Sequence, residues 1–261
     1  MDETMEKMLR ALRLHALRER WDEYVRLARK ARCSAVKLLI QIVEDEYLAK
    51  QDRAREFRLT RAQIPERYVM ATYPFERQPK LDRKKVLAIY DSLDYMLERR
   101  NVMLLGRTGS GKTGLATAYL TRAIERGYRG RFVRFADLVA ELYASIADHT
   151  QEKVLRRYAK YDCLLVDEVG YVDVEPVQAG LFFTLMQKRH KKRTTLVTSN
   201  LGFSDWGSFL RNPHLTAALV DRLTETSYVI NMRDCDGLRE PPPGERKPGP
   251  RKPGDRRKGR A

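Results

Sequence analysis

Apolar residues recur at two different spacings along this chain, and the change of spacing divides it into two parts. Within residues 1–64 they recur every three or four positions, the spacing of amphipathic α-helices. From residue 101 onward, short apolar runs alternate with helical stretches, as they do in a parallel sheet whose strands are joined by helices. The pattern predicts an α/β domain preceded by a helical one.

The first part is expected to contain two or three amphipathic helices. One apolar stripe extends from Met5 to Ala28, and Ser34 is placed to cap a second long helix that must end before Pro65. Residues 1–64 are therefore predicted to form a small N-terminal helical domain. Binding of DNA or a partner protein and service as a packing scaffold are both compatible with this pattern.

The second part is expected to contain five strands. Residues 65–84 include three prolines and show no clear period, so they are predicted to be a linker. Residues 85–239 are then predicted to form one α/β domain that begins with a helix over 85–99. The expected strands cover residues 101–105, 130–135, 163–166, 194–199 and 228–231. The first expected helix comes after the first strand and ends at Gly127. The other expected helices cover residues 136–147, 151–161, 177–189 and 213–224.

The strongest chemical signal follows the first strand. There the chain reads Gly106-Arg107-Thr108-Gly109-Ser110-Gly111-Lys112-Thr113-Gly114, which contains the G-x-x-x-x-G-K-[S/T] pattern of a phosphate-binding loop. The glycines allow backbone N–H groups to turn toward phosphates, and the helix N-terminus adds positive potential. Lys112 is expected to reach the β- and γ-phosphates of ATP and Thr113 to ligate Mg²⁺. A chance glycine-rich turn is the alternative, but the strand before it and the helix after it favour nucleotide binding.

Two carboxylates end the third expected strand, about fifty residues after the loop. Asp167 is expected to hold Mg²⁺ through water, and Glu168 to orient and polarise the attacking water. A glutamate in this second position favours hydrolysis over nucleotide sensing. Asn200 ends the fourth strand, where a polar side chain can contact the γ-phosphate or the attacking water. These residues predict one site, since ligands bind at the carboxyl ends of parallel strands.

The charge of the chain points to polyanionic partners. It has 51 Lys and Arg against 35 Asp and Glu, a net charge of +16. Residues 241–261 contain eight Lys or Arg and two acids, a net charge of +6, which leaves +10 for the rest. Ten of these 21 residues are Pro or Gly, so residues 240–261 are predicted to be a disordered basic tail.

Basic residues also gather in two places within residues 85–239, the expected ATPase domain. A solvated helix surface would explain them, and so would a sequence-tolerant contact with DNA phosphates. The candidate DNA-binding residues are Lys153, Arg156, Arg157 and Lys160 in one helix and Lys188, Arg189, Lys191, Lys192 and Arg193 at the end of another.

Other features restrict where the chain functions. Three scattered cysteines suit a reducing compartment, and no Cys or His pair has the spacing of metal ligands. The charged N-terminus contains no secretory signal, and no run of 18 apolar residues could span a membrane. A cytoplasmic location is expected.

The motifs together resemble the AAA+ ATPases, and more closely the IstB-like transposition helper ATPases, which are related to bacterial helicase loaders. The similarity covers about residues 5 to 235. The segments that carry it are GRTGSGKT (106–113), LLVDEVGY (164–171), TSNLGFSDWGSFL (198–210) and LTAALVDRLTETSYVI (215–230).

The resemblance implies further roles. Asn200 matches the sensor-1 position, and Arg222 matches an arginine finger offered to the nucleotide of a neighbouring subunit. Tyr73 and Phe75 lie where such proteins contact the base. The expected fold is an AAA+ core around a five-stranded parallel sheet without a C-terminal lid. Two departures are visible: Gly114 stands where these proteins have His, and residues 233–239 lack the usual final motif, so no role is transferred to them.

The function expected from this resemblance is ATP-dependent regulation of insertion-sequence transposition. A homo-oligomer would grip and deform duplex DNA and engage a transposase, with hydrolysis of ATP resetting the assembly. The first alternative is a helicase loader that acts on the replicative helicase. A nucleotide-gated scaffold with negligible turnover is disfavoured by Glu168 and Arg222, and a small-molecule kinase by the lack of a substrate lid.

Overall fold

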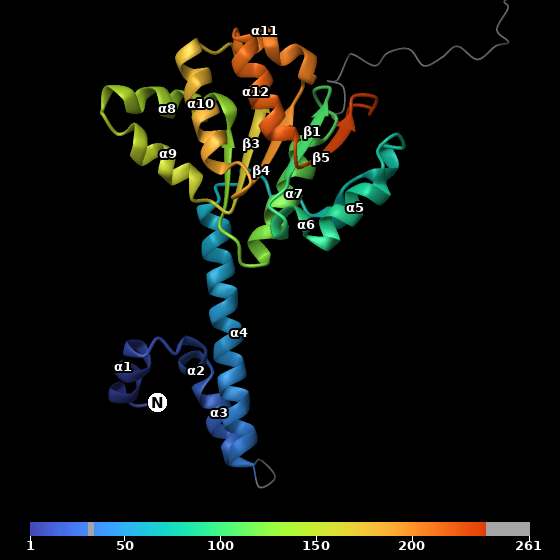
Figure 1. Cartoon of the computed structure of the whole chain (residues 1–261). Coiled ribbons are helices and arrows are strands. Elements are labelled where there is room, and N and C mark those ends of the chain that lie inside the picture. Colours follow the sequence, from blue (N-terminus) through green and yellow to red (C-terminus); the bar gives the residue numbers. More distant parts are fainter. Residues whose placement is uncertain (31–33, 239–261) are drawn as a thin grey trace, which may run out of the picture.

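The centre of the molecule is a five-stranded sheet. The computed structural model describes residues 1–30 and 34–238. All neighbouring strands are parallel, in the spatial order β2-β3-β4-β1-β5 (Figure 1). The strands are β1 (Asn101–Gly106), β2 (Gly130–Arg134), β3 (Cys163–Val169), β4 (Thr194–Ser199) and β5 (Ser227–Met232). The predicted fold is confirmed, and all five predicted strands are present.

Both faces of the sheet are buried, which explains why the strands read as continuous apolar runs. Successive side chains point to opposite faces: Val102 and Leu104 of β1 pack into one core, and Met103 between them packs into the other. Helix α7 (Lys112–Glu125) fills the first core together with α5 (Arg83–Ser92) and α6 (Asp94–Leu97). The second core is formed by α8 (Phe135–Ala147), α9 (Gln151–Ala159), α10 (Pro176–Arg189), α11 (Trp206–Leu210) and α12 (Pro213–Thr224).

The N-terminal helical region is present, but it is divided more finely than the pattern predicts. The stripe predicted from Met5 to Ala28 forms three short helices, with Arg13 in a left-handed conformation (φ 58°) after the first. Long α4 extends away from the α/β core and carries these helices at its far end (Figure 1). The bounds are α1 (Glu3–Ala11), α2 (His15–Glu19), α3 (Trp21–Ala28) and α4 (Ala35–Arg61).

Contacts at the two ends of α4 differ in kind. In the first half of the helix, the Glu46 carboxylate accepts hydrogen bonds of 2.8–3.1 Å from the first three backbone N–H groups of α2. Burial opposes ionisation of Glu46, but these donors and Arg53 lower its pKa below the usual value. At the other end, Leu59 and Ala62 are buried in the core beside α7. Helix α4 is therefore attached to both regions.

The segment predicted to be a linker packs closely on the phosphate loop. It contains two short 3₁₀ turns, η1 (Met70–Thr72) and η2 (Phe75–Arg77), and Met70 and Leu81 are buried. The buried Gln78 amide donates to the backbone oxygens of Ser110 (3.2 Å) and Asp236 (2.7 Å). The helix predicted over 85–99 is broken between α5 and α6 by Leu93, which adopts a left-handed conformation (φ 59°).

After β5 the chain returns to the phosphate loop. The backbone N–H of Leu238 donates to the oxygen of Gly109 at 2.7 Å. Between Met232 and Leu238 the described chain forms no further helix. The tail predicted over 240–261 lies outside the described residues. None of the helices within residues 1–30 and 34–238 combines the length and apolar character needed to cross a membrane.

Candidate nucleotide site

The phosphate loop joins the carboxyl end of β1 to the start of α7. Gly111 has a φ of +89°, which L-residues rarely adopt, and a Cβ there would lie 2.8 Å from the Tyr73 hydroxyl oxygen. Gly106 lies so close to β5 that a Cβ would meet the Met232 backbone oxygen at 2.6 Å. The glycine pattern of the motif is therefore required by the conformation and close packing of this loop.

Lys112 is held within the loop. Its side chain is buried, and its ammonium group donates to the backbone oxygens of Gly106 and Arg107, both at 2.8 Å. These bonds position the charge at the first turn of α7, where backbone N–H groups also favour an anion. The residues are thus arranged for phosphate binding.

The two carboxylates predicted on β3 lie beside this turn. Thr113 Oγ1 donates to the buried Asp167 carboxylate, 3.0 and 3.2 Å from its two oxygens. Hydroxyl and carboxylate oxygens are the hard ligands that Mg²⁺ prefers. Thr113 and Asp167 therefore fit the predicted role of holding Mg²⁺.

Thr198 of β4 links the two acids and is a residue to which the sequence motifs assigned no role. Its hydroxyl donates to Asp167 Oδ1 at 2.5 Å and accepts a hydrogen bond of 2.9 Å from the Glu168 backbone N–H. Glu168 has a φ of 63°, rare for a residue with a side chain. Such strain is common at functional sites, and here it accompanies a side chain that lines the adjoining cavity.

A cavity of about 570 Å³ lies against the loop and gathers most of the predicted residues. Asn200 also lines it, and its buried side-chain oxygen has no hydrogen-bond partner within the described part of the chain. An acceptor without a partner in the described chain, on a residue that shares the cavity lining with Glu168, suits a role in contacting water or phosphate. The lining residues are Glu66–Val69, Thr72–Pro74, Arg77, Thr108, Gly109, Gly111–Gly114, Glu168, Tyr171, Thr198, Asn200 and Leu238.

Some predicted nucleotide residues lie outside this lining. Gly106 and Arg107 contribute the backbone oxygens that hold Lys112, and Ser110 is buried beneath the loop. Phe75 packs edge-on against Tyr73, with ring centroids 4.8 Å apart, and beside the Arg83 guanidinium. The structure thus brings Tyr73 to the cavity wall but places Phe75 behind it.

Arg222 lies at the other end of the sheet. The neighbouring Leu223 backbone oxygen accepts a hydrogen bond from Asn101, the first residue of β1, whereas the phosphate loop follows Gly106 at the end of that strand. The Arg222 guanidinium lies over the Phe183 ring, 4.7 Å from its centroid, and donates to the Ala218 oxygen at 3.0 Å. Arg222 does not line the cavity of its own chain.

Arg189 was predicted to contact DNA, and the structure contradicts this. Its side chain is only 1% exposed and donates to the backbone oxygens of Tyr158, Tyr161 and Thr194 and to the Thr195 hydroxyl. Burial lowers its pKa to about 10. The charge run around it suggested a solvated helix end, but here the chain folds back on α9 and encloses the guanidinium.

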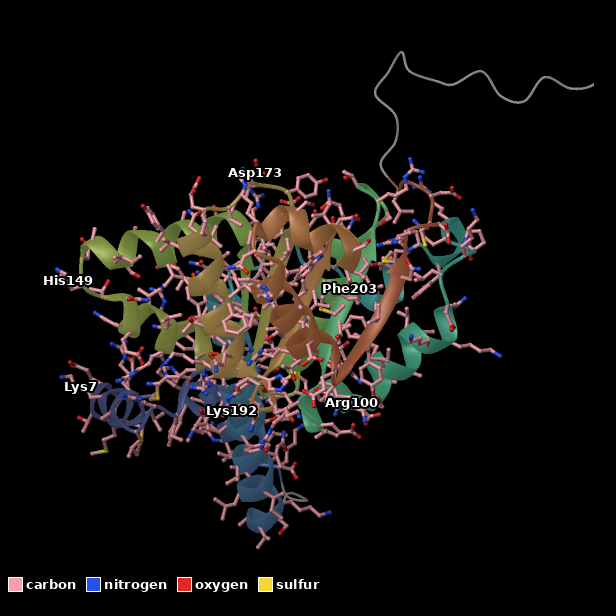
Figure 2. All side chains as sticks on the ribbon, turned by 45° about the horizontal axis from the view of Figure 1, so that its top comes forward. Lys7, Arg100, His149, Asp173, Lys192 and Phe203 are labelled. Carbon is pink, nitrogen blue, oxygen red and sulfur yellow. The ribbon has the colours of Figure 1, made fainter. Side chains whose placement is uncertain are left out.

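The other predicted basic residues form a surface over α9, the end of α10 and the loop before β4. Glu152 joins the two helices because it pairs with both Arg156 and Lys188. Within the described residues Lys153, Lys160 and Lys192 form no ion pair. Figure 2 places Lys192 and Arg100 at one end of the domain and Asp173 at the other. We call these residues the basic face: Lys153, Arg156, Arg157, Lys160, Lys188, Lys191, Lys192 and Arg193.

Comparisons with known proteins agree with this geometry. The sequence model of the family described as "IstB-like ATP binding protein" matches residues 7–240. A candidate ATP-binding protein of insertion sequence IS5376 from Geobacillus stearothermophilus is 30% identical, over 89% of this chain and 92% of its own length. Another, of insertion sequence IS21 from Pseudomonas aeruginosa, is 31% identical over 88% and 86% of the two chains. The crystal structure of DnaI has the same fold, with a TM-score of 0.54 and 22% identity over 63% of this chain and 90% of its own.

Proposed function

The chain belongs to the family of IstB-like ATP-binding proteins, and from this premise we propose that it is an ATP-hydrolysing, DNA-binding regulator of insertion-sequence transposition. The observation that carries the proposal is that Lys112, Glu168 and Asn200, from three different segments, line one cavity, and that Thr113 in the same lining is hydrogen-bonded to Asp167. A site that only recognises nucleotide does not require Glu168, the second carboxylate, or the side-chain oxygen of Asn200 that is unpaired among the described residues. The site is therefore assigned to hydrolysis.

The reaction follows from the position of each side chain. The loop amides and Lys112 bind the phosphates, exchanging the lysine's present backbone acceptors for phosphate oxygens. Mg²⁺, when bound, offsets phosphate charge, and Thr113 and Asp167 would hold it. Glu168 accepts a proton from the attacking water, and Asn200 orients that water or the γ-phosphate. Thr198 fixes the Asp167 carboxylate relative to the Glu168 backbone, because its hydroxyl is hydrogen-bonded to both.

Regulation comes from assembly in this proposal. Arg222 is too far from its own phosphate loop to reach it, so it completes the site of a neighbouring subunit in a homo-oligomer. Because a head-to-tail contact joins different ends of two subunits, the same contact repeats along the assembly. ATP thereby controls the assembly that grips and deforms duplex DNA and recruits the transposase.

The basic face is the proposed DNA surface of the ATPase domain, and the N-terminal helices are the proposed surface for DNA or the transposase. Six large apolar side chains in the first half of α4 are more than half exposed, as is typical of an interaction surface. They are Val36, Leu39, Ile40, Val43, Tyr47 and Leu48.

Replacing Lys153, Lys160 and Lys192 together with alanine should weaken duplex binding and lower its dependence on salt. Each phosphate contact contributes about 0.9 to the slope of log affinity against log salt, so the slope should fall by roughly 2 to 3. Binding of the full chain to duplexes of unrelated sequence, measured from 50 to 300 mM salt, checks this. The matched control removes three exposed lysines outside both proposed DNA surfaces, Lys80, Lys84 and Lys85. Equal effects of both variants would contradict the basic face as the DNA surface.

A helicase loader is the second candidate, supported by the common fold with DnaI. In that case the exposed face of α4 would bind a helicase, and single-stranded DNA would be preferred over duplex. Pull-down of the full chain with a transposase and with a replicative helicase separates the two functions. Capture of the helicase alone would favour the loader.

A further inference from the structure

The aromatic residues expected at the nucleotide base do not form the open part of the cavity. Tyr73 is only 9% exposed and is packed beneath Gly111 of the loop. Phe75 lies behind Tyr73, outside the cavity. Lys112, Asp167 and Glu168 show where the triphosphate binds. The base is therefore expected to contact other residues of the cavity lining, near the first turn of α7.

Tyr68 occupies this place. Its ring lies over the first turn of α7, where a Cβ added to Gly114 would be 3.3 Å from Cδ1 and 3.4 Å from Cγ. The side chain is 38% exposed and lines the cavity. Its hydroxyl donates to Glu66 Oε2 at 2.7 Å, and Glu66 lines the same cavity. A partly exposed ring, fixed at its hydroxyl end, is thus presented to any ligand in the site.

We propose that Tyr68 stacks against the base of the bound nucleotide and that Glu66 positions its ring. The inference rests on the proposed nucleotide site and assigns its base-binding part. It also accounts for Gly114: a larger side chain there would occupy the space beside the ring, so this chain combines a glycine at 114 with a tyrosine at 68. Stacking uses the face that every base has, so Tyr68 contributes affinity without selecting adenine over guanine.

Changing Tyr68 to alanine should reduce affinity for nucleotides but not for phosphate chains. We expect a loss of about tenfold for both Mg-ATP and Mg-GTP, within the range that one base–aromatic stack provides. Inorganic tripolyphosphate, which has no base, should bind within about twofold of the wild-type value. Titration of the full chain with each of the three probes by calorimetry measures these affinities.

Two variants complete the experiment. Tyr68→Phe keeps the ring but loses the bond by which Glu66 positions it, so its nucleotide affinity should fall between those of the wild type and Tyr68→Ala. Tyr143→Ala removes an exposed tyrosine of α8 and should change none of the affinities. Unchanged ATP binding by Tyr68→Ala would overturn the proposal, and so would a parallel loss of tripolyphosphate binding, which indicates damage to the whole site. Failure of the proposed function looks different, because the wild-type chain would then bind neither ATP nor tripolyphosphate, and both proposals would fall.

Discussion

Replacing Glu168 with glutamine should leave ATP binding intact and reduce steady-state hydrolysis by about two to four orders of magnitude, the usual contribution of a general base. Glutamine has nearly the same shape but cannot accept the proton of the attacking water. The backbone bond from residue 168 to Thr198 does not involve the side chain, so the unusual local conformation should persist. Calorimetry of ATP binding, together with release of phosphate, measures the two effects separately.

The same variant should accumulate on DNA in the presence of Mg-ATP, because the assembly forms but cannot reset. Glu98→Gln is the matched control: Glu98 is exposed and precedes β1, at the end of the sheet away from the phosphate loop. Normal turnover by a folded Glu168→Gln protein would refute the role of Glu168.

Changing Arg222 to alanine should leave ATP binding by the single subunit unchanged and lower assembly-dependent hydrolysis by about a thousandfold or more, as expected for an arginine finger. The reason is its position: β1 separates Asn101, beside α12, from Gly106 by about 16 Å of strand. Arg222 can therefore contact γ-phosphate only across a subunit interface. Hydrolysis is measured with DNA present, at protein concentrations that span assembly.

Mixing two inactive variants tests whether Arg222 acts across the interface. Subunits with Glu168→Gln still bind ATP, assemble and retain the finger, and subunits with Arg222→Ala retain an intact nucleotide site. In an equal mixture about a quarter of head-to-tail contacts would combine both intact parts and recover activity. No recovery would contradict action in trans. Arg222→Lys keeps much of the aliphatic stem that packs on Phe183, so comparing it with alanine separates loss of the guanidinium from loss of packing.

Sequence patterns predicted the sheet well because its strands are buried on both faces. Runs such as Cys163–Val166 and Thr194–Ser199 can hardly be placed elsewhere in an α/β fold. Helix breaks were harder to predict. Leu93 and Arg13 adopt left-handed conformations that their residue types do not indicate, so one predicted helix divides into two and a predicted stripe into three.

The site was predictable wherever a motif fixed the spacing of its residues. Lys112, Thr113 and Asp167 lie together because the loop and two neighbouring elements meet at one edge of the sheet. Thr198 begins a segment that carries the family resemblance, but nothing in that segment indicated its role, since threonine is an ordinary strand residue. Arg189 was misassigned because a run of charges does not reveal which member the tertiary fold encloses. Tyr68 lies in a segment without periodicity, and only its approach to Gly114 shows its place.

The central claim is that ATP bound at this loop joins subunits into an assembly on duplex DNA. Sedimentation velocity of the purified chain with a labelled duplex, with and without Mg-ATP, tests it most directly. The account predicts a large DNA-bound assembly that requires Mg-ATP and that the Lys112→Ala variant does not form. A wild-type chain that stays monomeric and leaves the duplex unbound at saturating Mg-ATP would contradict it.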